Sequence, residues 1–185
     1  MEIRVENCDR KHFLETTTRN RVSKMAGLFG SQNIVLSGKV FVGPTCVIRG
    51  DLAHVRVGKY SMIRDGTILR PSLKHFNKGV AFVPLTIGEH CLIEENVVVS
   101  AAQIGSFVNI GKNAVIGKRA VIKECAVILP DAVLAPDTVV PPFAIFGGAP
   151  ARPVGKVPDN HQEAITELTT TFYQNTKVED FGKGK

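Results

Sequence analysis

The sequence lacks the features that mark membrane, secreted and nucleic-acid-binding proteins. No apolar run approaches the ~20 residues that a membrane-spanning helix needs, and the stretch MEIRVENCDRKHFLE contains no hydrophobic core of a signal peptide. Five consecutive residues of like charge occur nowhere, so the net charge of +6 is spread along the chain. We therefore expect a cytoplasmic protein with no membrane insertion and no nucleic-acid partner.

Cysteine is also scarce, and the four cysteines are widely separated at Cys8, Cys46, Cys91 and Cys125. None of them has CxxC spacing, so the sequence supports neither a zinc knuckle nor a dithiol redox motif. Cys46 and Cys91 fall where the repeat described below requires a small inward-facing residue. We therefore predict that they are small core residues in a reducing compartment.

What the sequence does contain is a six-residue repeat, within a chain of 185 residues whose length is typical of one domain. An aliphatic residue returns every six positions at Ile104, Ile110, Ile116, Ile122, Ile128, Leu134 and Val140. A small residue, such as Ala114 or Ala120, stands two places before the next aliphatic residue. Neither the period of a helix nor that of a single strand explains this pattern.

Hexads predict short strands joined by tight corners, with ~18 residues in each coil of a three-sided prism. Stacked coils pair as parallel strands roughly 4.8 Å apart, so about six coils form a rod roughly 30 Å long. Glycine often follows the aliphatic residue, and we expect it there because a turn with unusual dihedral angles tolerates glycine best. These glycines are Gly58, Gly88, Gly105, Gly111 and Gly117. The pattern resembles the hexapeptide-repeat proteins, which implies an all-β fold, the left-handed parallel β-helix.

Breaks in the repeat divide the chain into three parts. We expect residues 1–32 to form an N-terminal cap, residues 33–151 the left-handed β-helix, and residues 152–185 a C-terminal α-helix and tail. Within the β-helix, residues 70–86 interrupt the period and predict a protruding loop. The C-terminal helix is predicted from helical spacing, and we expect it to lie against an end or a side of the prism. The spaced residues are Ile165, Leu168, Thr169 and Phe172.

The stretch VIRGDLAHVRVGKYSMIRDGTILR, residues 47–70, resembles the γ-class carbonic anhydrase branch of this family. The matching R-G-D turn and the later acidic residue are Arg49, Gly50, Asp51 and Asp65. The resemblance implies that such residues pack between neighbouring prisms, and we expect Arg49, Asp51 and Asp65 at an interface. The alternative for Arg49 and Asp51 is an ion pair that only closes the turn.

The same resemblance implies a zinc ion held by three histidines, but the matching positions are Arg70, Glu95 and Ser100. Arginine has no lone pair for a metal, and a neutral serine hydroxyl is a poor zinc ligand. The five histidines of the chain do not show the spacing of a substitute ligand set. We therefore expect no metal, no cofactor and no catalytic residue.

Further stretches narrow the resemblance. SQNIVLSGKVFV, KGVAFVPLTIGEH and VPPFAIFGGAP are similar to the β-helical subunits of the dynactin pointed-end complex, and the similarity covers about residues 23–150. The most distinctive part is the phase-breaking KGVAFVPL, residues 78–85. This resemblance implies a noncatalytic, cytoskeleton-associated adaptor subunit that supports cargo or adaptor attachment for dynein-driven microtubule transport. The implied partners are a sister β-helix subunit as heterodimer, a pointed-end actin-related protein, a zinc-containing dynactin subunit and dynein cargo adaptors.

The phase-breaking loop is the expected site of partner contacts, through Phe76, Val80, Phe82 and Val83. A loop that folds back onto its own coil is the alternative. Two enzymes are the alternative functions: a γ-class carbonic anhydrase, and a hexapeptide acyltransferase with His75 or His90 as the catalytic base. The missing zinc ligands argue against the first, and nothing beside either histidine marks an acyl-donor site.

Overall fold

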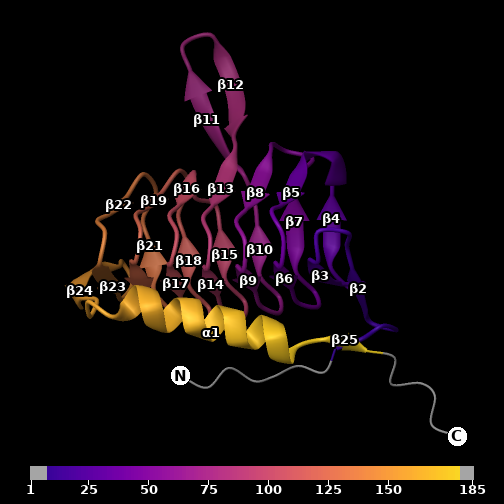
Figure 1. The fold of residues 1–185 in the computed structure, drawn as a ribbon. Coiled ribbons are helices and arrows are strands. Elements are labelled where there is room, and N and C mark those ends of the chain that lie inside the picture. The colour runs from indigo at the N-terminus through magenta and orange to yellow at the C-terminus, as the bar shows by residue number, and fades with distance from the viewer. Residues whose placement is uncertain (1–7, 180–185) are drawn as a thin grey trace, which may run out of the picture.

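The computed structural model describes residues 8–179, and most of them form a prism of three sheets (Figure 1). Sheet I contains β2 (Phe13–Glu15), β3 (Arg21–Ser23), β6 (Phe41–Val42), β9 (Met62–Ile63), β14 (Leu92–Ile93), β17 (Asn109–Ile110), β20 (Val127–Ile128), β23 (Ala144–Gly147) and β24 (Arg152–Lys156). Sheet II contains β4 (Gly27–Phe29), β7 (Val47–Arg49), β10 (Ile68–Leu69), β15 (Val98–Val99), β18 (Val115–Ile116) and β21 (Val133–Leu134). Sheet III contains β5 (Ile34–Leu36), β8 (Val55–Val57), β13 (Leu85–Ile87), β16 (Gln103–Ile104), β19 (Val121–Ile122) and β22 (Val139–Val140).

The remaining elements lie outside these sheets. They are β1 (Cys8–Asp9), a 3-10 turn (Ser31–Asn33), β11 (Ser72–Phe76), β12 (Gly79–Val83), α1 (His161–Asn175) and β25 (Val178–Glu179). Of the predicted cap and tail, residues 1–7 and 180–185 lie outside the described residues.

Each complete coil contributes one strand to each sheet, from β3, β4 and β5 in the first coil to β20, β21 and β22 in the sixth. Neighbouring coils pair in parallel, as in the pairing of Ile104 with Ile122 and of Ile110 with Ile128. The left-handed parallel β-helix of about six coils is therefore confirmed. The parallel pairing begins at Arg21. The first coil therefore includes part of segment 1–32, in which the six-residue repeat is not recognisable from the sequence.

The aliphatic and small residues of the repeat fill the interior of the prism. The fully buried residues include Ile110, Ile122, Ala114 and Ala120. A small residue accompanies each aliphatic one because a narrow prism has room for only one large side chain per strand. The predicted core role of two cysteines is confirmed, because Cys46 and Cys91 are fully buried free thiols in this core. Burial raises the pKa of both thiols to about 12.

The corners of the prism correct the predicted role of the glycines. The left-handed residues at the corners are mostly not glycine; Tyr60 and His90, for example, have φ values of 57° and 51°. Each stands two places after a glycine of the repeat, and those glycines do not have left-handed dihedral angles. Gly58 is required for another reason, because a Cβ atom there would lie 2.4 Å from the backbone of Gly88 in the next coil. The glycines allow successive coils to stack closely.

Helix α1 runs along the outside of sheet I and covers a side of the prism (Figure 1). Outward-facing Phe41, Met62 and Leu92 form a second apolar cluster with Ile165 and Phe172. The Phe41 and Phe172 rings meet edge to face, with centroids 5.0 Å apart. The predicted helix is therefore confirmed, and its apolar spacing corresponds to burial against this sheet.

Polar contacts fix α1 at both ends and in its middle. His161 hydrogen-bonds through Nε2 to the Phe107 carbonyl oxygen (3.0 Å), and the Tyr173 hydroxyl donates to the Arg19 carbonyl oxygen (2.7 Å). Between them, His90 Nδ1 and the Thr169 hydroxyl lie 2.7 Å apart. These contacts anchor the helix to one corner of the prism along most of its length. Among the described residues, no helix is long and apolar enough to cross a membrane.

The phase-breaking segment is an antiparallel hairpin of β11 and β12 that projects away from the prism, on the side opposite α1 (Figure 1). It leaves the corner between β10 of sheet II and β13 of sheet III. The expected protrusion is therefore confirmed over the alternative of a loop folded back onto its own coil. Arg119 fixes the base of the hairpin: its guanidinium donates to the Leu73 carbonyl oxygen (2.8 Å) and pairs in bidentate fashion with Asp137 (2.7 Å).

Candidate interaction surfaces

The R-G-D turn follows β7, at the corner between sheets II and III. Arg49 donates from Nε and Nη2 to the two carboxylate oxygens of Asp51, both at 2.8 Å. This hydrogen-bonded pair lowers the pKa of Asp51 and raises that of Arg49. A Cβ atom at Gly50 would lie 2.6 Å from the Ile34 side chain of the preceding coil, so the turn requires glycine. The turn is thus closed within one chain, and both charged side chains still reach solvent.

Asp65 lies at a different corner, between β9 of sheet I and β10 of sheet II. The structure therefore does not bring it together with Arg49 and Asp51. Its Oδ1 atom is buried and has no hydrogen-bond partner among the described residues. Burial raises the pKa of Asp65, with the neighbouring charge of Arg64 acting in the opposite direction. Asp65 therefore lies outside the R-G-D surface.

The three positions that match zinc ligands do not fit a zinc ion. Arg70 and Ser100 directly follow β10 and β15, which are adjacent strands of sheet II, but neither side chain is a zinc ligand. Glu95 lies at the corner between sheets I and II and is engaged by two cations, Arg64 at 3.5 Å and Lys112 at 3.7 Å. Within residues 8–179, no group of three or more histidine, cysteine, aspartate or glutamate side chains is arranged so that it could hold a metal ion.

The outward face of sheet II carries a continuous row of apolar side chains, which we call the apolar stripe. It consists of Val47, Ile68, Val98, Val115 and Val133, each paired in register with the next. Val115 and Val133 are 38% and 40% exposed, and the other three are partly exposed. Because paired strands lie roughly 4.8 Å apart, these side chains form a flat, regular row along the prism.

The other two faces differ from this one. The outward positions of sheet I are also apolar at Phe41, Met62 and Leu92, but α1 covers them. Sheet III carries Arg56, Thr86 and Gln103 in the middle of its outward row, so its outward valines, at Val35, Val121 and Val139, do not form a continuous apolar row. Only sheet II, among the three faces of the described residues, therefore presents an apolar row that no other element covers.

Two arginines lie beside the apolar stripe. Arg49 and Arg70 follow the inward residues Ile48 and Leu69, which pair with each other, so the arginines occupy neighbouring positions at one corner. The Arg49 guanidinium also lies over the exposed ring of Phe29, 5.6 Å from its centroid. The hairpin leaves the prism directly after Arg70. The stripe, the arginines and the hairpin base are consequently continuous on the surface.

The hairpin divides the predicted contact residues between two faces. Cross-strand pairing places Val80 and Phe82 on one face, with Leu73, and it places Phe76 and Val83 on the other. Phe76 and Val80 are 53% and 54% exposed, whereas Phe82 and Val83 near the base are partly buried. The four side chains therefore do not form one patch, and each face of the hairpin offers a separate apolar pair.

Sequence reasoning missed the apolar stripe, although the signal for it was present. In a β-helix the residue before each inward aliphatic residue points outward. Reading those positions coil by coil gives Val47, Ile68, Val98, Val115 and Val133 for one face, whereas polar residues interrupt the valines on another. The six-residue period identifies the inward residues, and the residue before each inward one shows whether the exposed face is apolar or polar.

This architecture defines a hexapeptide-repeat protein of the left-handed β-helix class, and solved structures agree. A hexapeptide transferase family protein from Anaplasma phagocytophilum is 19% identical, with a TM-score of 0.58 over 84% of this chain and 89% of that chain. A mutant of AntD, an N-acyltransferase from Bacillus cereus in complex with dTDP and coenzyme A, is 17% identical, with a TM-score of 0.67 over 82% and 88% of the two chains. At these identities the likeness shows the fold alone.

Sequence comparison is more specific. The family profile of dynactin subunit 5 matches residues 1–178. The protein named dynactin subunit 5 in Dictyostelium discoideum is 49% identical over 175 residues, which cover 95% of this chain and 88% of that protein. The chain belongs to the dynactin subunit 5 family.

Proposed function

We propose that this protein is a noncatalytic subunit of the dynactin pointed-end complex, and that it pairs with the sister β-helix, dynactin subunit 6, through the face of sheet II. The observation that carries the proposal is the apolar stripe, which is flat, regular and uncovered within residues 8–179. Exposed apolar rows of this kind mark interaction surfaces. The bidentate Arg49–Asp51 pair and Arg70 form a polar rim beside it, as in known interfaces.

A second β-helix is the partner that best matches this surface. Its coils repeat at the same ~4.8 Å spacing, so a row of side chains on one prism fits between the rows of another along the whole contact. The proposal assigns Arg49 and Asp51 to the edge of this interface. Asp65, at the other corner of sheet II, lies at its opposite edge.

The hairpin is the proposed contact for further partners. Strands β11 and β12 project beyond the prism on the side opposite α1 (Figure 1), and they carry the exposed Phe76 and Val80 and the partly buried Phe82 and Val83. We assign to them contacts with the pointed-end actin-related protein, dynactin subunit 4 or dynein cargo adaptors. In this role the subunit supports cargo or adaptor attachment for dynein-driven microtubule transport, as a cytoplasmic, cytoskeleton-associated protein.

The side-face proposal is tested by purifying tagged variants from cytosol at mild salt and identifying the copurifying proteins by mass spectrometry. Val115→Lys places a charge within the stripe, at one of its more exposed positions, and is expected to release the sister subunit. Val139→Lys is the matched control, because Val139 is an exposed outward valine on sheet III. Equal recovery of dynactin subunit 6 with both variants overturns the assignment of sheet II.

The hairpin is tested in the same way with Phe82→Asp, and Asn77→Asp at the hairpin tip is the control. A charge in an interface centre weakens binding by about 2 kcal/mol or more, so we expect loss of at least one pointed-end component while the sister subunit stays bound. An intact complex with Phe82→Asp and also with Phe76→Asp, on the opposite face, refutes the hairpin assignment.

The noncatalytic assignment rests on the side chains at the family ligand positions, Arg70, Glu95 and Ser100. Measurable CO2 hydration that disappears on chelation contradicts it. Binding of coenzyme A in calorimetry supports the acyltransferase alternative instead.

A further inference from the structure

The N-terminal end of the prism carries a short edge strand. Strand β2 is the last strand of sheet I and pairs antiparallel with β3, and no other strand of the described residues pairs with its outer edge. The flanking hydrogen bonds from Thr16 N to Asn20 O and from Lys24 N to His12 O show that even-numbered residues face β3. The backbone groups of Phe13 and Glu15 therefore point away from β3, as the alternation of an antiparallel pair requires.

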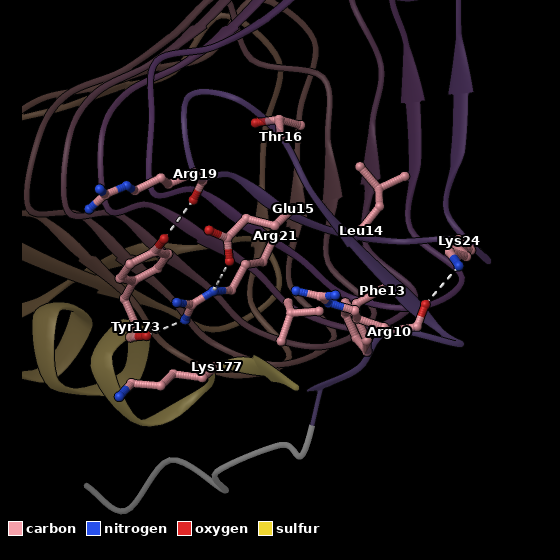
Figure 2. A pocket seen from close by; sticks show the side chains of 11 residues that line it. Arg10, Phe13, Leu14, Glu15, Thr16, Arg19, Arg21, Lys24, Tyr173 and Lys177 are labelled. Carbon is pink, nitrogen blue, oxygen red and sulfur yellow. Dashed lines mark hydrogen bonds and ion pairs between the residues drawn. The ribbon is translucent and has the colours of Figure 1, made fainter. Parts of the chain in front are cut away.

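A pocket of about 730 Å³ lies beside this edge (Figure 2). One wall comes from β2 and the residues around it, and another comes from the end of α1 and the chain that follows it. Phe13, Leu14 and Val178 give the pocket an apolar part, and Leu14 is 44% exposed. The volume is several times that of a phosphate ion and fits a short extended segment of chain better.

The charged side chains of this pocket are almost all cations. They are Arg10, Arg19, Arg21, Lys24 and Lys177, against the single carboxylate of Glu15. Arg21 pairs with Glu15 and donates to the Tyr173 carbonyl oxygen, and Lys24 donates to the Arg10 carbonyl oxygen (2.7 Å). A pocket with this charge balance favours an anionic occupant.

Arg19 and Lys177 are the cations most available to such an occupant. Both are exposed, and neither side chain forms an ion pair with another described residue. Figure 2 shows them on either side of Tyr173, with their charged groups at the outer ends. Tyr173 itself is fixed by its hydroxyl bond to the Arg19 carbonyl oxygen and by the Arg21 guanidinium, 3.7 Å from its ring centroid. The two free cations thus stand on a rigid base.

We propose that this end of the prism binds an acidic, extended peptide segment of a partner protein, which adds as a strand to the outer edge of β2. Main-chain hydrogen bonds to an exposed edge supply affinity in this mode, and the side chains of alternate residues supply specificity. Here the acidic side chains of the peptide meet Arg19 and Lys177, and its apolar side chains, on the opposite face of the added strand, meet Leu14. The inference goes beyond the proposed subunit role and does not depend on the apolar stripe.

The probe is a fluorescein-labelled eight-residue peptide in which glutamate alternates with valine, titrated with the full-length protein and followed by fluorescence anisotropy. Two matched peptides separate the contributions of charge and of main-chain hydrogen bonds to binding. One replaces glutamate by glutamine, and the other carries N-methyl groups on alternate backbone amides. We expect the glutamate peptide to bind at least tenfold more tightly than either, with an affinity that falls as salt is raised.

Protein variants locate the site. The double variant Arg19→Gln, Lys177→Gln is expected to weaken binding at least tenfold, whereas Lys118→Gln, at an exposed corner of a distant coil, leaves it unchanged. Circular dichroism of each variant establishes that it is folded. Equal binding of the glutamine peptide, or an unchanged affinity in the double variant, overturns the proposal. Equal binding of the N-methylated peptide also overturns it, because the peptide does not then add as a strand.

Discussion

Replacing Phe172 by alanine tests whether α1 is part of the cooperative structure of the prism. Phe172 is only 4% exposed and belongs to the cluster that joins α1 to the outward face of sheet I. Its ring meets Phe41 edge to face, and the Arg64 guanidinium lies over it, 5.4 Å from the ring centroid. The substitution removes both ring contacts and leaves a cavity between helix and sheet.

The expected loss of unfolding free energy follows from this burial. Replacing a buried phenylalanine by alanine costs about 3–5 kcal/mol. The cavity lies beneath a single helix that can move toward the sheet, so we expect about 3 kcal/mol, the lower end of that range. Thr171→Ala is the matched control, because Thr171 is exposed on the same helix and a surface substitution changes stability by less than about 0.5 kcal/mol.

The assay is urea unfolding followed by circular dichroism, combined with hydrogen exchange of the α1 amides under native conditions. If α1 unfolds with the prism, Phe172→Ala lowers the midpoint and leaves the slope of the transition unchanged. If α1 detaches alone, the variant accelerates exchange in α1 while the main transition stays in place. A loss below about 1 kcal/mol with unchanged α1 exchange refutes the packing argument, because a phenylalanine buried in this way costs more.

Two further predictions concern titrating groups. Burial lowers the pKa of His90 below its ordinary value of 6.5, so the folded protein disfavours the proton and its free energy of unfolding decreases as the pH falls below 6.5. In urea unfolding at pH 7.5 and 5.5, the decrease in unfolding free energy between the two pH values should be smaller for His90→Asn than for the unaltered protein. An equal decrease in both proteins contradicts the assignment to His90. Cys46 and Cys91 are completely buried, and the pKa of each thiol is raised to about 12. We therefore predict that neither thiol reacts with Ellman's reagent at pH 8 until urea unfolds the protein. Rapid labelling of either cysteine in the native protein would contradict this and would show that the core opens locally.

The sequence predicts the interior of this protein better than its surface. A residue such as Ile116 or Ala120 is determined by its own coil and the two beside it, so a fixed period is enough to identify it as inward. The same reasoning placed Cys46 and Cys91 correctly in the core. The hairpin was recognisable because it breaks the period, and α1 because its apolar residues change to helical spacing.

The features that were missed depend on contacts between distant parts of the chain. Whether Phe41, Met62 and Leu92 are exposed depends on α1, which begins more than sixty residues after the last of them. The glycines were misinterpreted for a similar reason: Gly58 is required by the backbone of Gly88 in the next coil, and the local turn does not need it. The pocket at the N-terminal end joins Arg19 to Lys177, a pair that no local pattern connects.

The distribution of outward residues explains how one simple repeat provides separate surfaces. The interior pattern must be the same on all three faces, because every coil fills the same narrow core. The outward positions are under no such constraint, and here one face is covered by α1, one has outward valines interrupted by polar residues and one carries the apolar stripe. The edge of β2 adds a surface at the end of the prism, perpendicular to these faces. Because stacked coils form a stiff rod, the stripe, the hairpin and the basic end are held at fixed positions relative to one another. The proposed function, the positioning of other proteins, requires no chemistry at the positions that match zinc ligands, and Arg70, Glu95 and Ser100 are compatible with it.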